Sequence, residues 1–229
     1  MSRFEGTGAL ALWIDIEPAL QAEADVWYVD EHLPERIIKA GYRRAARYVA
    51  IEGAPRYLSL FEADTPEALA SPGYLALVRE ISEQSRRLRA GFGNVVRNTF
   101  AVRASVGRGD GGVIGAFRLS PAGAAGAAGT ALDALLPQLV SAPCIIAAHR
   151  LEAAPAVRAA MDAVRATGTG DARVDHVLLV EATQASDLAA RRAGPLADAA
   201  LAAAGWRVDA YGVYQLLCVM RGTDPGGAR

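Results

Sequence analysis

This sequence lacks long hydrophobic runs and an excess of charge of either sign, and it has only two cysteines. No apolar stretch reaches the roughly 20 residues that a membrane-spanning helix requires. The apolar run near the start is interrupted by Asp15 and Glu17, unlike the core of a signal peptide. Because 24 Lys and Arg balance 25 Asp and Glu, no electrostatic attraction to nucleic acid or an anionic membrane is expected. These absences predict a cytoplasmic protein with no nucleic-acid or membrane partner.

Metal and cofactor motifs are also scarce. Cys144 and Cys218 lie in apolar, strand-like contexts, which predicts two buried free thiols. No histidine stands at ligand spacing from either, so no metal site is predicted. The Gly-rich stretch 107–112 is not followed by the Lys-Ser/Thr pair of a phosphate-binding loop, and we interpret it as a linker. No cofactor is predicted.

What the sequence does contain is an internal repeat. The stretch WIDIEPA, which starts at Trp13, matches AFRLSPA 103 residues later. DEHLP at 30–34 returns as DALLP at 133–137, with the same spacing. Self-similarity of this kind indicates that one structural unit occurs twice.

A third match shows where the two copies differ in length. YLSLFEADTPEAL, from Tyr57, matches HVLLVEATQASDL, from His176, at a spacing of 119 residues. The second copy therefore gains residues between its second and third strands. We predict the insertion in the helix-prone, glycine-ended segment 154–170.

Each copy has the pattern strand, helix, strand, strand, helix, strand. Residues 9–16 alternate as a strand does, and a helix is predicted from Pro18. The fold class is therefore α+β, with two tandem ferredoxin-like (βαββαβ) units, residues 1–106 and 107–229, forming an intramolecular dimeric α+β barrel. Barrel closure then needs no second chain, although homodimerisation through outer surfaces stays open.

One phrase of the first copy resembles a known family. Trp27, His32-Leu33-Pro34, Gly41-Tyr42 and Arg47-Tyr48 follow the pattern of the EthD-like branch of the dimeric α+β barrel superfamily. The phrase does not extend to the second copy, where Leu135 replaces the histidine. The superfamily includes monooxygenases, isomerases, cyclases and haem-handling proteins, so the resemblance implies the fold and a small-molecule site rather than one reaction.

His32 is the main catalytic candidate. Pro34 lacks an N–H and disfavours a helical residue before it, so the first helix is predicted to break there and aim His32 into the barrel mouth. The second copy keeps the Asp, Leu and Pro of the phrase but loses its glutamate and its histidine. Since imidazole titrates near neutrality, His32 is predicted to transfer protons. The alternative is a histidine that only packs or hydrogen-bonds at a kink.

The strand faces suggest partners for His32. In the first strand the aliphatic residues share one side, which places Trp13 and Asp15 toward the barrel interior. Arg118 stands at the corresponding place in the second copy. Asp15 is predicted to orient His32 or act as a second acid–base group, and Arg118 to bind an anion. A structural Asp15–Arg118 bridge is the alternative.

Four other residues complete the predicted substrate-binding set. Arg97 and Asn98 point to opposite sides of their strand, so one of them is predicted to face inward. Tyr28 and Tyr48 supply hydroxyl groups, although buried tyrosines more often serve the core. The arginines of segment 86–89 lie near a helix end, and we interpret them as a solvated face.

Three functions fit these residues. The first is a cofactor-independent isomerase, lyase or cyclase that acts on a small, partly apolar carbonyl or aromatic compound, with His32 as the acid or base and Arg97 or Arg118 as the anion binder. The second is a haem- or oxygen-dependent member, with His32 as iron ligand or proton shuttle. The third is a non-catalytic protein that binds a small ligand. We favour the first.

Overall fold

Eight antiparallel strands close into one barrel in the computed structural model, which describes residues 4–123, 125–165 and 170–222. The order around the barrel is β1-β3-β2-β8-β5-β7-β6-β4. The strands are β1 (Gly8–Ile16), β2 (Arg44–Glu52), β3 (Tyr57–Ala63), β4 (Phe92–Gly107), β5 (Val113–Pro121), β6 (Ile145–Ala153), β7 (His176–Ala182) and β8 (Trp206–Arg221). Each unit contributes four neighbouring strands, so the predicted intramolecular α+β barrel is confirmed.

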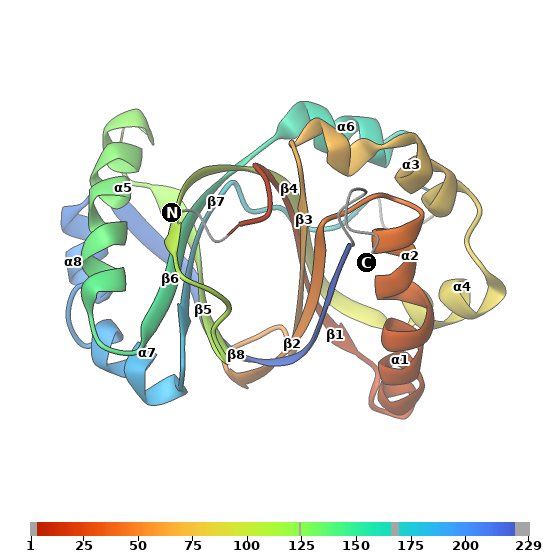
Figure 1. Cartoon of the computed structure of the whole chain (residues 1–229), viewed down its shortest axis with the longest axis horizontal. Coiled ribbons are helices and arrows are strands. Elements are labelled where there is room, and N and C mark those ends of the chain that lie inside the picture. Colours follow the sequence, from red (N-terminus) through yellow and green to blue (C-terminus); the bar gives the residue numbers. More distant parts are fainter. Residues whose placement is uncertain (1–3, 124, 166–169, 223–229) are drawn as a thin grey trace, which may run out of the picture.

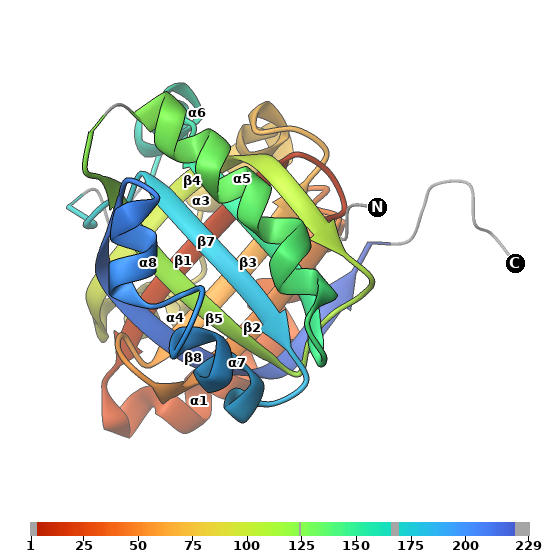
Figure 2. The same cartoon turned by 90° about the vertical axis from the view of Figure 1, so that its left-hand side faces the viewer.

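Helices cover the barrel on two opposite sides (Figure 1). The first unit supplies α1 (Gln21–Trp27), α2 (Leu33–Ile38), α3 (Pro72–Arg79) and α4 (Glu83–Ala90) on one side. The second unit supplies α5 (Ala125–Ser141), α7 (Ala185–Arg192) and α8 (Asp198–Ala203) on the other, and α5 runs across the sheet in Figure 2. No helix in the described ranges is long and apolar enough to cross a membrane.

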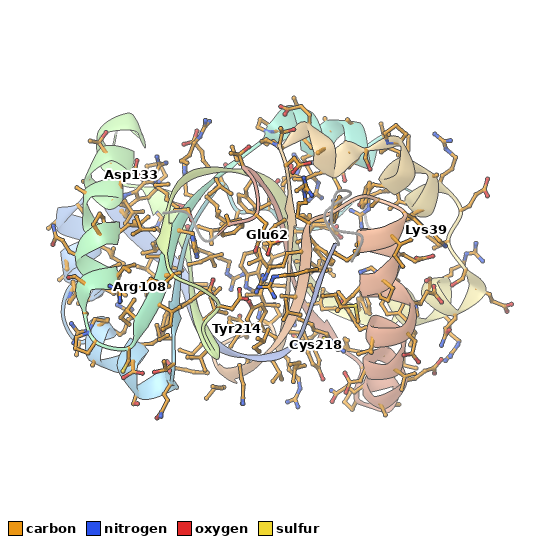
Figure 3. All side chains as sticks on the ribbon, in the orientation of Figure 1. Lys39, Glu62, Arg108, Asp133, Tyr214 and Cys218 are labelled. Carbon is orange, nitrogen blue, oxygen red and sulfur yellow. The ribbon has the colours of Figure 1, made fainter. Side chains whose placement is uncertain are left out.

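The alternation of β1 separates two cores. Ile14 and Leu12 pack under the first helical layer, as their spacing predicts. Trp13 is 1% exposed and packs inside the barrel with Tyr48 and Leu58. Glu62 and Tyr214 also lie inside the barrel, whereas Lys39 is exposed just after the end of α2 (Figure 3).

The pairing register corrects the sequence repeat. Tyr57 of β3 stands opposite Ile14 of β1, and its predicted counterpart His176 stands opposite Leu119 of β5. The sequence match had placed Phe117, not Leu119, at the position of Ile14. The difference is two residues, which preserves the side to which each side chain points because strands have a period of two.

The predicted insertion forms an extra helix that leaves its own unit. Helix α6 (Pro155–Asp162) follows β6 and packs against the 3-10 turn η3 (Glu67–Ala70), which leads into α3 (Figure 1). Its Val157 and Met161 are buried in the hydrophobic core of the first unit. The second unit therefore contributes part of the first unit's helical layer.

The cysteine prediction is only partly right. Both thiols are free, but Cys144 is exposed and Cys218 is half-buried. Cys144 stands just before β6 with φ of +63°, in a turn rather than within a strand. The expectation that both are buried is therefore wrong.

Candidate functional site

His32 is held by a wide turn of helix rather than by a break. Residues Tyr28–His32 form a π-helical turn that joins α1 to α2, and Pro34 lies in the first turn of α2. There the missing N–H of proline costs little because the first N–H groups of a helix are unpaired. The predicted break before Pro34 is wrong, because the π-turn carries the chain through. Such turns occur frequently at functional sites.

The side chain of His32 points at the outer face of the sheet. It is 7% exposed, and its ring centroid lies 4.4 Å from that of Trp27, 5.0 Å from Tyr28 and 6.0 Å from Phe61. Its Nδ1 is buried without a hydrogen-bond partner among the described residues. The prediction that His32 points into the barrel is therefore wrong: it lies between the helices and the sheet.

A cavity of about 410 Å³ opens beside His32. Its floor is the outer face of β1, β3 and β4, its walls are helices α2, α3 and α4, and residues beyond α6 close one side. The lining residues are Leu10, Leu12, His32, Arg36, Phe61, Tyr74, Val78, Arg89, Phe92, Val95, Arg97, Arg165, Gly170 and Asp171. A volume of this size suits a small organic ligand.

An ion network ties the inserted segment to the cavity. Arg97 of β4 donates to Asp162 Oδ1 at 3.2 Å and to the Tyr74 hydroxyl at 3.1 Å. Arg158 donates to Asp162 Oδ2 at 2.6 Å, and Arg165 donates to Asp171 at 2.9 Å. The second unit thus both closes the cavity and orients Arg97.

The cavity is electropositive, and this sets the state of its titratable groups. Burial, together with the charges of Arg36, Arg89 and Arg47, holds the pKa of His32 well below its usual value. The imidazole is therefore neutral at pH 7. Burial raises the pKa of Tyr74, but Arg97 and Arg36 outweigh that effect, and the net pKa is lower than usual.

Two predicted binding residues lie near His32. Arg97 lines the same cavity. Tyr28 packs its ring against His32, while burial raises the pKa of its hydroxyl. Its ring also stacks on the guanidinium of Arg47, 3.9 Å from the ring centroid. Tyr28 therefore contacts the His32 ring but does not line the cavity.

The remaining predicted residues lie in or at the barrel and do not line this cavity. Asp15, predicted to orient His32, accepts instead from the Arg56 N–H and from Asn94, both at 2.7 Å. Arg118 lies over the Trp13 ring and donates to the Ala54 carbonyl at 3.0 Å. Asp15 and Arg118 therefore bind other partners, and the alternative prediction of a bridge between them is wrong.

Asn98 and Tyr48 are structural. Asn98 donates to the Val174 carbonyl at 2.7 Å. The Tyr48 hydroxyl accepts from Arg44 at 3.2 Å, and Arg44 pairs with Glu62 at 2.9 Å. These bonds satisfy polar groups of the closed barrel, as buried polar groups require.

The sequence reasoning missed Arg36, Arg89 and Tyr74. Arg36 stands four residues after His32, a spacing that places both on one helix face. Arg89 was interpreted as solvated, but only Arg86 and Arg87 of that stretch are exposed. Ser85 and Leu88 are buried, so the inward face of α4 could have been found from its periodicity. Tyr74 gave no comparable signal.

The corresponding layer of the second unit is packed with apolar side chains. Leu132, Leu136 and Trp206 are each fully buried there. Leu135, the counterpart of His32, is partly buried against the same cluster. Asp133 of DALLP pairs with Arg150 at 2.5 Å. This unit therefore uses the repeated phrase for packing.

The chain has the fold of a dimeric α+β barrel of ferredoxin-like plan, closed within one chain. No family model and no curated protein matches the sequence. The structure is similar to an anthrone oxidase-like protein (TM-score 0.60, 15% identity, 100% of this chain and 99% of that chain covered). It is also similar to a protein from Fusobacterium nucleatum that is proposed to be a monooxygenase (TM-score 0.56, 8% identity, 98% and 100% covered). A third is a heme-binding protein from Thermus thermophilus (TM-score 0.52, 11% identity, 95% of each chain covered).

These likenesses establish the fold alone. At such identities, proteins that share a barrel differ in reaction and cofactor. The names of the similar proteins span oxidase-like, monooxygenase and heme-binding descriptions. Function has to be argued from the cavity and its residues.

Proposed function

We propose that this protein is a cofactor-independent enzyme of the isomerase, lyase or cyclase type, acting on a small, partly apolar carbonyl or aromatic compound. The observation that carries the proposal is the neutral imidazole of His32 on the wall of a cavity that also holds several guanidinium groups. A base beside fixed positive charge is what enolate formation needs.

The chemistry needs no partner beyond the chain. Nδ1 of His32 is enclosed, so Nε2 is the nitrogen through which His32 would meet a ligand. Nε2 takes a proton from a carbon next to the carbonyl, and the C–H electron pair moves into an enolate whose oxygen faces an arginine. Return of the proton to another carbon gives an isomer, and departure of a β-substituent gives an elimination.

The low pKa of His32 is compatible with this role. The cations that make the imidazole a weak base also lower the energy of the enolate, which favours ionisation of the substrate. As negative charge develops beside His32, it offsets the repulsion from Arg36 and Arg89, and the imidazole becomes more basic. The base therefore strengthens along the reaction coordinate.

A proton-exchange experiment tests the proposal without knowledge of the product. Enolisable carbonyl compounds are incubated with the full chain in D₂O, and loss of their α-proton signals is followed by NMR. His32→Gln is expected to slow the exchange by about 10²–10⁴-fold. His176→Gln, a control at a half-buried histidine outside the cavity, should leave the rate unchanged. Equal rates in wild type and His32→Gln would refute the role of His32.

A haem- or oxygen-dependent reaction is the second candidate. His32 has the kind of donor atom that binds haem iron, because the imidazole is neutral and its Nε2 is the nitrogen available to a ligand. A bound haem would supply redox chemistry at iron, and His32 would hold it. Titration with hemin distinguishes the two candidates: a Soret band that shifts with wild type but not with His32→Ala favours this one.

We further propose that residues 1–106 and 107–229 are the two structural units and that the protein works in the cytoplasm on a small-molecule substrate. One chain closes its own barrel, so any homodimer would form through outer surfaces. Sedimentation and limited proteolysis between β4 and β5 test the unit boundary and the assembly.

A further inference from the structure

Two arginines of the cavity, Arg36 and Arg89, have no hydrogen-bonded carboxylate partner among the described residues. Arg36 is 4% exposed, and its Nη1 is enclosed without a hydrogen bond. The nearest carboxylate oxygen, Glu35 Oε2, is 3.9 Å away, beyond hydrogen-bond range, and Glu35 binds Lys39 at 2.8 Å. Arg89 lines the same cavity. Burial and the charge of Arg36 lower the pKa of Arg89 to about 10.

The carboxylates beside the cavity are already engaged. Asp162 pairs with Arg97 and Arg158, and Asp171 pairs with Arg165. On the helical side, Glu31 accepts from Ser82 and Ser85, at 2.9 and 2.8 Å. Among the described residues, no carboxylate remains to neutralise both Arg36 and Arg89.

Cation–π contacts place the two guanidinium groups next to aromatic rings. Arg36 lies over the Tyr74 ring, 5.5 Å from its centroid, and Arg89 lies over the Trp27 ring at 6.0 Å. Such contacts hold a cation without a hydrogen bond or an ion pair. Nη1 of Arg36 is enclosed, so a carboxylate in the cavity would meet the remaining N–H groups of Arg36 and those of Arg89, which both line it.

The rest of the cavity is apolar. Leu10 and Leu12 of β1 and Val95 of β4 form its floor, with Val78 and Phe92 beside them. A small hydrated anion would gain nothing from this surface. An anion with a hydrophobic body would cover it and expel its water.

We propose that the cavity binds a monocarboxylate with an apolar or aromatic body, whose carboxylate bridges Arg36 and Arg89. The body lies on the β1–β4 floor, next to His32. This inference deepens the proposed function, because it names the substrate class of the same site. Binding and proton transfer are separable, so each can fail alone.

Calorimetric titration of the full chain tests the inference directly. The probes are benzoate, cyclohexanecarboxylate, acetate, inorganic phosphate and the neutral benzyl alcohol. We expect benzoate and cyclohexanecarboxylate to bind about 10–100-fold more tightly than benzyl alcohol, the range for a hydrogen-bonded charged group. Acetate and phosphate should bind more weakly than benzoate. Equal binding of phosphate and benzoate would mean an adventitious anion only and would overturn the proposal.

Variants separate a binding role from a structural one. Arg36→Gln and Arg89→Gln should each weaken benzoate binding about 10-fold or more. Arg86→Gln, an exposed position on the same helix as Arg89, should leave affinity unchanged. Without anion, Arg89→Gln should melt no lower than wild type, because it removes one of two repelling charges. Unchanged benzoate affinity in both cavity variants refutes the proposal.

An NMR readout on His32 distinguishes this inference from the proposed function. A carboxylate between the arginines offsets their field, so benzoate should raise the pKa of the His32 imidazole. Benzoate binding with this shift but no proton exchange would refute the proposed function and leave the anion site standing. Proton exchange on neutral ketones without benzoate binding would refute the anion site and leave the proposed function standing.

Discussion

Replacing His32 with leucine gives a stability change whose sign and pH dependence follow from its burial. The ring is 7% exposed and its Nδ1 has no hydrogen-bond partner among the described residues. A buried unsatisfied polar atom costs about 1–3 kcal/mol, and leucine removes it while keeping contact with Trp27 and Phe61. At pH 7.5 the variant should therefore be as stable as wild type or more stable by about 1 kcal/mol.

Lowering the pH should increase the difference in stability between His32→Leu and wild type. The folded-state pKa of His32 is depressed, so below about pH 6.5 the unfolded chain takes up a proton that the folded protein refuses. Wild-type stability is then lost as pH falls from 6.5 toward the folded pKa, by up to about 1.4 kcal/mol per pH unit. The variant lacks this term, so at pH 5.5 its relative advantage should grow by about 1 kcal/mol.

Urea unfolding at pH 7.5, 6.5 and 5.5 measures the effect. His176→Leu is the matched control: its folded pKa is also lowered, but the ring is only half-buried, so its gap should widen less. A His32→Leu gap that is the same at all three pH values would refute the reasoning. A variant that fails to fold would show that DEHLP is structural.

Three further predictions concern the site and the barrel. Asp162→Asn should lower the free energy of unfolding by about 3 kcal/mol, because it removes the charge that pairs with buried Arg97 and Arg158; a loss below about 1 kcal/mol in urea would contradict this. As the pH is lowered, kcat/KM should decline with a midpoint below pH 6.5, because the pKa of His32 is depressed. A midpoint at or above pH 6.5 would count against the role of His32. Because one chain closes the barrel, the urea midpoint should not change with protein concentration, whereas a barrel shared between chains would make it concentration-dependent.

The sequence by itself determined the local part of the structure. Alternation over residues 9–16 placed Trp13 and Ile14 on opposite faces, and the observed strand β1 covers the same residues. The comparison of DEHLP with DALLP singled out His32, since the two copies share Asp, Leu and Pro and only the first carries the glutamate and the histidine. These inferences depend on neighbours in the chain, which short-range periodicity encodes.

Only the tertiary structure decided where the site is. Barrel closure pairs β2 with β8 and β4 with β6, and this fills the interior, so the cavity lies outside, under the first helical layer. It also carries α6 across to the other unit, where Asp162 meets Arg97. Arg36 and Arg89 come together because two separate helices pack on one sheet. Contacts between distant segments depend on packing that no local pattern records, and the cationic cavity is made of such contacts.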